Sequence, residues 1–127
     1  ANTPNGNDNN TISNNNLGPV GTSLPTKAVS CMAHKHTAIG NSGITITNNN
    51  IFDYFGAAVT SSGVHVANGC NNWQITSNRF YQTGTRTWTT GAMHRAIDIS
   101  SSTAPFGAQG FTITGNVIGY ASPTQTG

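Results

Sequence analysis

The chain has 127 residues, enough for one domain, and a net charge of only +2. Asp, Glu, Lys and Arg make up 6% of the residues, against about 25% in an ordinary soluble protein. The five basic side chains form no cluster, which argues against a nucleic-acid partner. No apolar stretch reaches the roughly 18 residues that a membrane span needs. Disordered chains combine high net charge with few β-branched residues, so the recurring Ile, Val and Thr runs of this neutral chain predict a repetitive β structure.

Four segments of the chain align without gaps and define an internal repeat: 10–17, 44–51, 73–80 and 111–118. Each segment alternates apolar and polar residues over four positions, which is typical of a half-buried strand. Each then has an Asn at a predicted corner and ends on an apolar residue. We predict a buried column of Ile12, Ile46, Ile75 and Ile113. We also predict a hydrogen-bonded ladder at the corner, formed by Asn15, Asn49, Asn78 and Asn116.

Two weaker sets of segments complete the repeat. The first set is 28–32, 63–67 and 96–100, with Val29, Val64 and Ile97 predicted to stack inside beside Cys31, Val66 and Ile99. Ser30, His65 and Asp98 would then form a row on the outer face. A third strand is predicted after the Asn corner, at 52–55, 81–83 and 119–121. The loops are 19–27, 56–62, 84–95 and 101–109.

These patterns predict an all-β fold, a right-handed parallel β-helix (β-solenoid) of about four coils with irregular loops. No run of ten residues has helical periodicity, and no Asn-Gly pair joins two strong alternating segments as a sandwich hairpin would require. We interpret residues 1–127 as a single β-helix segment. Neither end supplies a cap for the exposed core, so we expect the segment to belong to a longer solenoid or to an assembly of copies.

Several runs resemble the β-helix repeats of large secreted and surface proteins of Bacteroidota. The resemblance is carried by residues 6–19, 43–55, 80–83 and 115–120, and it covers nearly the whole chain. It implies a parallel β-helix of the pectin-lyase-like type in a long, exported, repetitive protein. The wider fold includes pectate lyases, polygalacturonases and phage tailspikes, so the resemblance implies a fold more strongly than a role.

Catalysis is not expected from the carboxylates of the chain. Asp8, Asp53 and Asp98 are its only acidic residues, and no two share a register position in the alignment. Glycoside hydrolysis by a pair of acids and calcium-dependent polysaccharide lyase chemistry both need clustered carboxylates. His65 and Asp98 should lie on neighbouring coils, where we expect an ion pair of modest value. We therefore predict no catalytic residues and no cofactor.

The cysteines and histidines offer a second candidate site. Cys31, His34 and His36 have a spacing that suggests metal ligands, but a fourth zinc ligand is lacking. Cys31 also falls on an inward position, where a thiol acts as a small apolar group. We predict no metal site, and we expect a Cys31–Cys70 disulfide to be poorly placed.

Two surfaces could bind a ligand. Trp88 lies in the longest loop, near Tyr81, Arg86 and His94, and these four residues are candidates for binding a glycan; Trp73 aligns with core residues instead. The outward rows of Thr and Ser are similar to the ice-binding faces of some antifreeze proteins. These rows comprise Thr11, Ser13, Thr45, Thr47, Gln74, Thr76, Thr112 and Thr114.

The expected function is structural and non-enzymatic: an extracellular spacer, adhesin or filament component at the cell surface. Its expected partners are copies of itself or neighbouring repeats. The alternative function is that of a carbohydrate-binding or polysaccharide-processing module, and ice binding is a further alternative.

Overall fold

The computed structural model describes residues 6–32, 40–100 and 107–119, and this part of the chain is all-β with no helix. Its strands form four parallel sheets. The first sheet has the order β1 (Thr11–Ser13), β5 (Thr45–Thr47), β9 (Gln74–Thr76), β12 (Thr112–Thr114). The second comprises β2 (Asn16–Leu17), β6 (Asn50–Phe52), β10 (Arg79–Tyr81) and β13 (Val117–Ile118).

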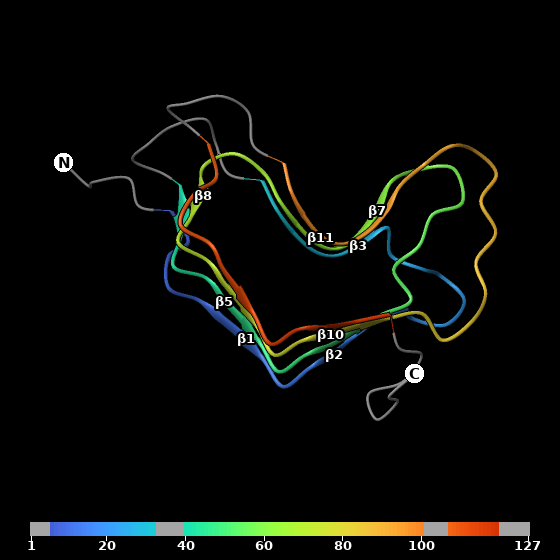
Figure 1. Cartoon of the computed structure of the whole chain (residues 1–127), viewed down its shortest axis with the longest axis horizontal. Coiled ribbons are helices and arrows are strands. Elements are labelled where there is room, and N and C mark those ends of the chain that lie inside the picture. The colour runs from blue at the N-terminus through green and yellow to red at the C-terminus, as the bar shows by residue number, and fades with distance from the viewer. Residues whose placement is uncertain (1–5, 33–39, 101–106, 120–127) are drawn as a thin grey trace.

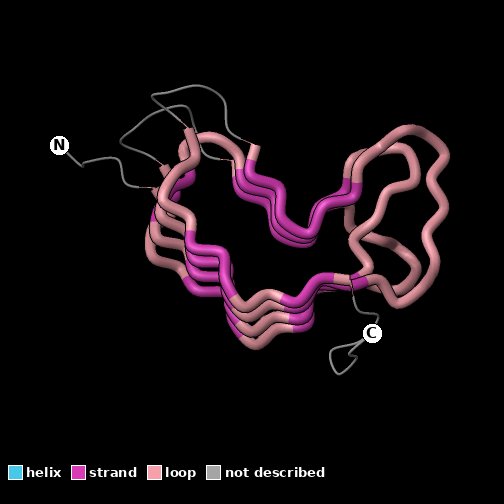
Figure 2. Tube along the Cα trace, viewed as in Figure 1, coloured by secondary structure: helices cyan, strands magenta, loops and turns pink. Residues whose placement is uncertain are grey.

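The other two sheets are smaller. One contains β3 (Lys27–Cys31), β7 (Ser61–Val66) and β11 (His94–Ile99). The other pairs β4 (Asn41–Ser42) with β8 (Cys70–Asn71), and Gln109 adds an isolated parallel bridge to Asn71. The chain visits the sheets in the same order each time, and we call each visit a circuit. The circuits are β1–β4, β5–β8, β9–β11 and β12–β13; they lie on one another in Figures 1 and 2.

The predicted register of the isoleucine column is confirmed, but only its two inner members are fully buried. Ile12 pairs with Ile46, Ile46 with Ile75, and Ile75 with Ile113, all in parallel register. Ile46 and Ile75 are fully buried, whereas Ile113 in the last circuit is 43% exposed. The first four-strand sheet therefore supplies one wall of a core that also contains Ile51, Tyr54, Val64, Val66, Trp73 and Phe80.

The asparagine ladder is also confirmed, and it runs in one direction. In each step the backbone N–H and the side-chain amide of one Asn both donate to Oδ1 of the Asn in the next circuit. The three steps join Asn15 to Asn49, Asn49 to Asn78, and Asn78 to Asn116, with distances of 2.9 to 3.3 Å. Asn49 and Asn78 are buried, so the ladder satisfies polar groups that water cannot reach.

The left-handed backbone of the corner lies one residue before the ladder. Asn14, Asn48, Ser77 and Gly115 have φ between 55° and 65°, a region that Asn and Gly enter at low cost. A second column with left-handed backbone precedes the first sheet, at Asn9, Gly43, Asn72 and Gly110. This column was not predicted, although its members follow the same 34, 29 and 38 residue intervals as the ladder.

The second strand set has the predicted register. Val29, Val64 and Ile97 are paired across the third sheet, as are Cys31, Val66 and Ile99. Ser30, His65 and Asp98 form the predicted row, and His65 Nδ1 lies 3.2 Å from Asp98 Oδ2. Asp98 is only 8% exposed, and Arg95 and Ser100 also donate hydrogen bonds to its carboxylate.

Two expectations need correction. The strand after the Asn corner begins earlier than predicted: it spans Asn50–Phe52 and Arg79–Tyr81 instead of 52–55 and 81–83, because the chain pairs as soon as the corner is complete. In the fourth circuit the strand is Val117–Ile118, and residues 120 and 121 lie outside the described residues. The expectation that Cys70 is poorly placed for Cys31 was wrong, since the two sulfur atoms are 3.0 Å apart.

The outward Thr rows lie in register on the first sheet. Thr11, Thr45, Gln74 and Thr112 form one column, and Ser13, Thr47, Thr76 and Thr114 form the other. Thr76 donates its hydroxyl hydrogen to Thr47 Oγ1 at 3.0 Å. The columns are thus a regular polar face, and ice binding by this face stays a prediction.

Candidate functional site

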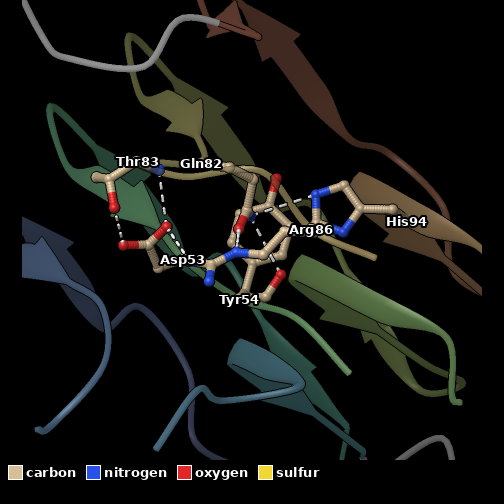
Figure 3. A network of polar contacts seen from close by, with 6 residues as sticks. All are labelled: Asp53, Tyr54, Gln82, Thr83, Arg86 and His94. Atoms are coloured by element: carbon tan, nitrogen blue, oxygen red, sulfur yellow. Dashed lines mark hydrogen bonds and ion pairs between the residues drawn. The ribbon is translucent and has the colours of Figure 1, made fainter. Parts of the chain in front are cut away.

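Three segments from two neighbouring circuits meet beside the second sheet and form what we call the loop cluster. They are Asp53, Tyr54 and Phe55 after β6, Gln82 to Trp88 after β10, and His94 at the start of β11. Figure 3 shows six of these residues converging from the two circuits. The cluster exists because β6 and β10 are adjacent in the sheet, so the segments that leave them start side by side.

Asp53 is the polar centre of the loop cluster. Its carboxylate accepts hydrogen bonds from the backbone N–H and the hydroxyl of Thr83 and from Arg86 Nη2. Asp53 is 5% exposed and has a left-handed φ of 53°. Burial acts to raise the pKa of Asp53, but the hydrogen bonds from Thr83 and Arg86 and the charge of Arg86 outweigh it and hold that pKa below its ordinary value.

Arg86 and Gln82 connect this centre to His94. Arg86 Nε donates to Gln82 Oε1 at 2.9 Å, and Gln82 Nε2 donates to the Tyr54 carbonyl at 3.2 Å. The same Gln82 nitrogen lies 3.4 Å from His94 Nε2. Burial and the nearby Arg86 guanidinium lower the pKa of His94, which favours the neutral imidazole that can accept this hydrogen bond.

Aromatic rings line the outer part of the loop cluster. Phe55 and Trp88 meet edge to face at a centroid distance of 4.8 Å, and Tyr54 stacks on His94 at 4.7 Å. Arg86 Cζ lies 5.9 Å above the Phe55 ring, within the range of a cation–π contact. Phe55, Gln82, Arg86, Trp88 and His94 enclose a hollow of about 100 Å³.

The structure brings together three of the four predicted ligand-binding residues. Arg86, Trp88 and His94 line the same hollow. Tyr81 does not line it: that ring stacks on Phe52 at 5.4 Å and borders a neighbouring hollow of about 250 Å³, which Gln82 and His94 also line. Phe55 and Gln82 were not predicted as lining residues, because the sequence placed both inside strands, at 52–55 and 81–83, whereas the strands end at Phe52 and Tyr81.

We predict that acid destabilises the protein partly through Asp53. Because the folded-state pKa of Asp53 is lowered, its contribution to stability is present above the unfolded pKa of about 4 and is lost as the pH falls through the folded value. Thermal unfolding of wild type and Asp53→Asn between pH 2 and 6 tests this. The melting temperature of the variant should fall less on acidification than that of wild type. The fall that remains is expected to come from Asp98. Burial acts to raise the pKa of Asp98, but hydrogen bonds from Arg95, His65 and Ser100 and the charge of Arg95 outweigh it and lower that pKa. Parallel profiles would contradict the prediction.

All three carboxylates of the chain have structural partners, and they lie apart. Asp8 accepts a hydrogen bond from Ser42 N–H, Asp53 belongs to the loop cluster, and Asp98 binds His65 and Arg95. Within residues 6–32, 40–100 and 107–119, no three His, Cys, Asp or Glu side chains are grouped as metal ligands. His34 and His36 lie outside the described residues.

Comparisons with known proteins give no relative. No family model, no curated protein and no solved structure matches the chain. The part of the chain that the structure describes has no helix long and apolar enough to cross a membrane.

Proposed function

We propose that the chain is a right-handed parallel β-helix segment with a structural, non-enzymatic role, whose two ends stack on further coils of the same kind. The in-register isoleucine column and the four parallel sheets support a solenoid. We assign right-handed coils because crossover connections between parallel strands of one sheet are strongly biased toward the right-handed form. An extracellular spacer, adhesin or filament is the form of this role that the resemblance to surface β-helix repeats favours.

The open ends of the asparagine ladder carry the proposal. Each ladder step needs an Oδ1 acceptor in the circuit that follows, so the ladder has a direction. At one end Asn15 Oδ1 accepts no hydrogen bond from the described residues. At the other end the backbone N–H of Asn116 donates to none of them. A further coil, or the first circuit of another copy, would supply the missing acceptor to Asn116, and the two ends are therefore complementary in a head-to-tail stack.

Apolar surface at the ends supports the same role. Ile113 is 43% exposed and Ile118 is 59% exposed in the last circuit, whereas the equivalent Ile75 and Phe80 are buried. The outer edges of β12 and β13 have no strand partner among the described residues. Unpaired strand edges next to exposed apolar side chains are surfaces on which strands add.

The chemistry of the carboxylates supports a role without catalysis. The three acidic side chains lie in separate hydrogen-bond networks: one binds Ser42, one lies in the loop cluster and one lies on the third sheet. Paired-acid hydrolysis needs two carboxyl groups facing one substrate bond. The few fixed charges also impose little electrostatic repulsion between stacked copies.

We expect the 127-residue chain to self-associate through its ends. Light scattering over a micromolar concentration series should show growing assemblies. Ile118→Asp should weaken association about 10- to 100-fold, the factor that corresponds to burying one large aliphatic side chain, at about 1.5–3 kcal/mol. Val59→Asp is the matched control, because Val59 is also half exposed, at 50%, but lies in the loop between β6 and β7 of the second circuit. A wild-type chain that stays a stable monomer throughout would overturn the proposal.

Binding of a carbohydrate is a second candidate function, favoured by the aromatic hollow of the loop cluster. Phe55 and Trp88 offer ring surface to a sugar, and Arg86 is close by. The hollow of about 100 Å³ is smaller than the roughly 300 Å³ of a small-molecule pocket, so it would hold the edge of one sugar unit.

We expect Trp88→Ala to weaken any binding of soluble oligosaccharides about tenfold, as loss of a central aromatic contact usually does. Calorimetric titration with a panel of oligosaccharides measures this, and Val20→Ala, at an 87% exposed position outside the cluster, is the control. Absence of binding by wild type, or equal binding by Trp88→Ala, would remove this candidate.

A further inference from the structure

The two cysteines of the chain meet between neighbouring circuits. Cys31 ends β3 in the first circuit and Cys70 begins β8 in the second, and their sulfur atoms are 3.0 Å apart. The strands containing them belong to different sheets: Cys31 is paired with Val66, and Cys70 with Asn41. A tight turn joins β7 to β8 through Gly69, whose φ is 76°, and brings Cys70 back against Cys31.

We propose that Cys31 and Cys70 are a thiol–disulfide site, at which oxidation joins the first and second circuits by a covalent bond. Both are thiols in this structure. The contact is already made in the folded chain, so the bond needs only a small closing movement of the two side chains. This proposal is independent of the structural role proposed above.

The two thiols differ in access, and the difference sets the order of the reaction. Cys70 is fully buried, whereas Cys31 is partly exposed and lines a hollow of about 320 Å³ together with Asn41, Ile12 and Val29. Asn41 Nδ2 also donates a hydrogen bond to Cys31 Sγ at 3.0 Å, which holds that sulfur at the hollow. Cys31 is therefore the attacking thiol and Cys70 the resolving thiol.

The reaction is a thiol–disulfide exchange with a small-molecule disulfide as oxidant. The Cys31 thiolate attacks one sulfur of that disulfide, forms a mixed disulfide and releases one small thiol. The Cys70 thiolate then attacks Cys31 Sγ and releases the second small thiol. The two protein thiols lose two electrons and two protons in total, and the oxidant takes them up as two thiols.

The bond would stabilise the N-terminal end of the fold. It closes a loop between positions 39 residues apart, which restricts the unfolded chain far more than the folded one. The oxidised protein should melt about 10 °C above the reduced protein, given the usual entropy of such a loop and the size of the chain.

The test equilibrates the reduced 127-residue protein with buffers of reduced and oxidised glutathione, then blocks the remaining thiols by alkylation. Trypsin separates the two cysteines, because cleavage after Lys27, Lys35 and Arg79 leaves Cys31 in 28–35 and Cys70 in 36–79. We expect a linked pair of these peptides that disappears on reduction, and the higher melting temperature in the oxidised sample. Separate alkylated peptides, or linkage between chains in place of linkage within one chain, would overturn the proposal.

Single-cysteine variants test the order of attack. Cys70→Ser should accumulate a mixed disulfide between Cys31 and glutathione, because no resolving thiol is present. Cys31→Ser should keep Cys70 unmodified for at least about ten times as long, because that thiol is buried. Faster glutathione capture by Cys70 than by Cys31 in these folded variants would contradict the assigned roles, and the peptide map of the wild-type protein decides the main proposal even where a variant does not fold.

Discussion

Replacing Ile75 with alanine is expected to lower the free energy of unfolding by about 2–5 kcal/mol, the usual range for a fully buried large-to-small change. Ile75 is 0% exposed and lies between Ile46 and Ile113 in the isoleucine column. The substitution leaves a cavity that the paired strands on both sides prevent from collapsing, since their backbones are fixed by the sheet. Urea unfolding followed by far-ultraviolet circular dichroism measures the change.

Ile113→Ala is the matched control for Ile75→Ala. It removes the same atoms from the same column, but Ile113 is 43% exposed in the last circuit, so we expect a loss below about 1.5 kcal/mol. Both substitutions should be made in an Ile118→Asp background, which keeps self-association from burying Ile113. Equal losses of unfolding free energy at the two positions would contradict a column that is buried at Ile75 and open to solvent at Ile113.

The isoleucine column and the asparagine ladder could be predicted because each circuit uses the same residue at the same place. In a stack of parallel strands each side chain contacts its own counterpart in the next circuit, so the physical contact is visible as a sequence repeat. Asn49 and Asn78 illustrate this: both are buried, and a buried amide is tolerated at this position only because another amide lies above and below it.

Contacts that do not repeat could not be predicted in this way. Arg86 reaches Asp53 across 33 positions of sequence, and it does so only in one circuit, through a loop that has no counterpart of equal length. The Cys31–Cys70 contact has the same origin, because it joins positions that differ within the repeat. Such contacts depend on how each loop returns to the sheets, which no periodic pattern records.

The backbone conformation of the chain repeats at one place where the residue type does not. The second column with left-handed backbone mixes two residue types, so no single residue type recurs at this place in the repeat. Its members are Asn9, Gly43, Asn72 and Gly110. Asn and Gly share the low cost of positive φ. The column is therefore recorded in the sequence as a shared backbone preference and not as a shared residue.

Replacing Asn78 with alanine is expected to cost about 2–6 kcal/mol, because it leaves several buried polar groups without partners. The Asn78 side chain accepts hydrogen bonds from the backbone and side chain of Asn49, and it donates to the Ile46 carbonyl and to Asn116 Oδ1. At least the Asn49 N–H and the Ile46 carbonyl lose a partner that water cannot replace, at about 1–3 kcal/mol each. Asn15→Ala is the control: Asn15 is exposed, and among the described residues its side chain only donates, to the Ser13 carbonyl and to Asn49 Oδ1.

Asn78→Asp separates the donor from the acceptor role of the same side chain. The carboxylate can still accept from Asn49, but it faces the Ile46 carbonyl and Asn116 Oδ1 without a hydrogen to donate. Burial and these oxygen atoms should raise the folded-state pKa of the new carboxyl above its unfolded value. A raised folded pKa means that the variant gains stability relative to wild type as the pH falls through that pKa, since the protonated form regains a donor. Urea unfolding of both proteins at pH 7 and pH 5 measures the difference. A difference that stays constant or widens in acid would show that the donor bonds of the ladder contribute little.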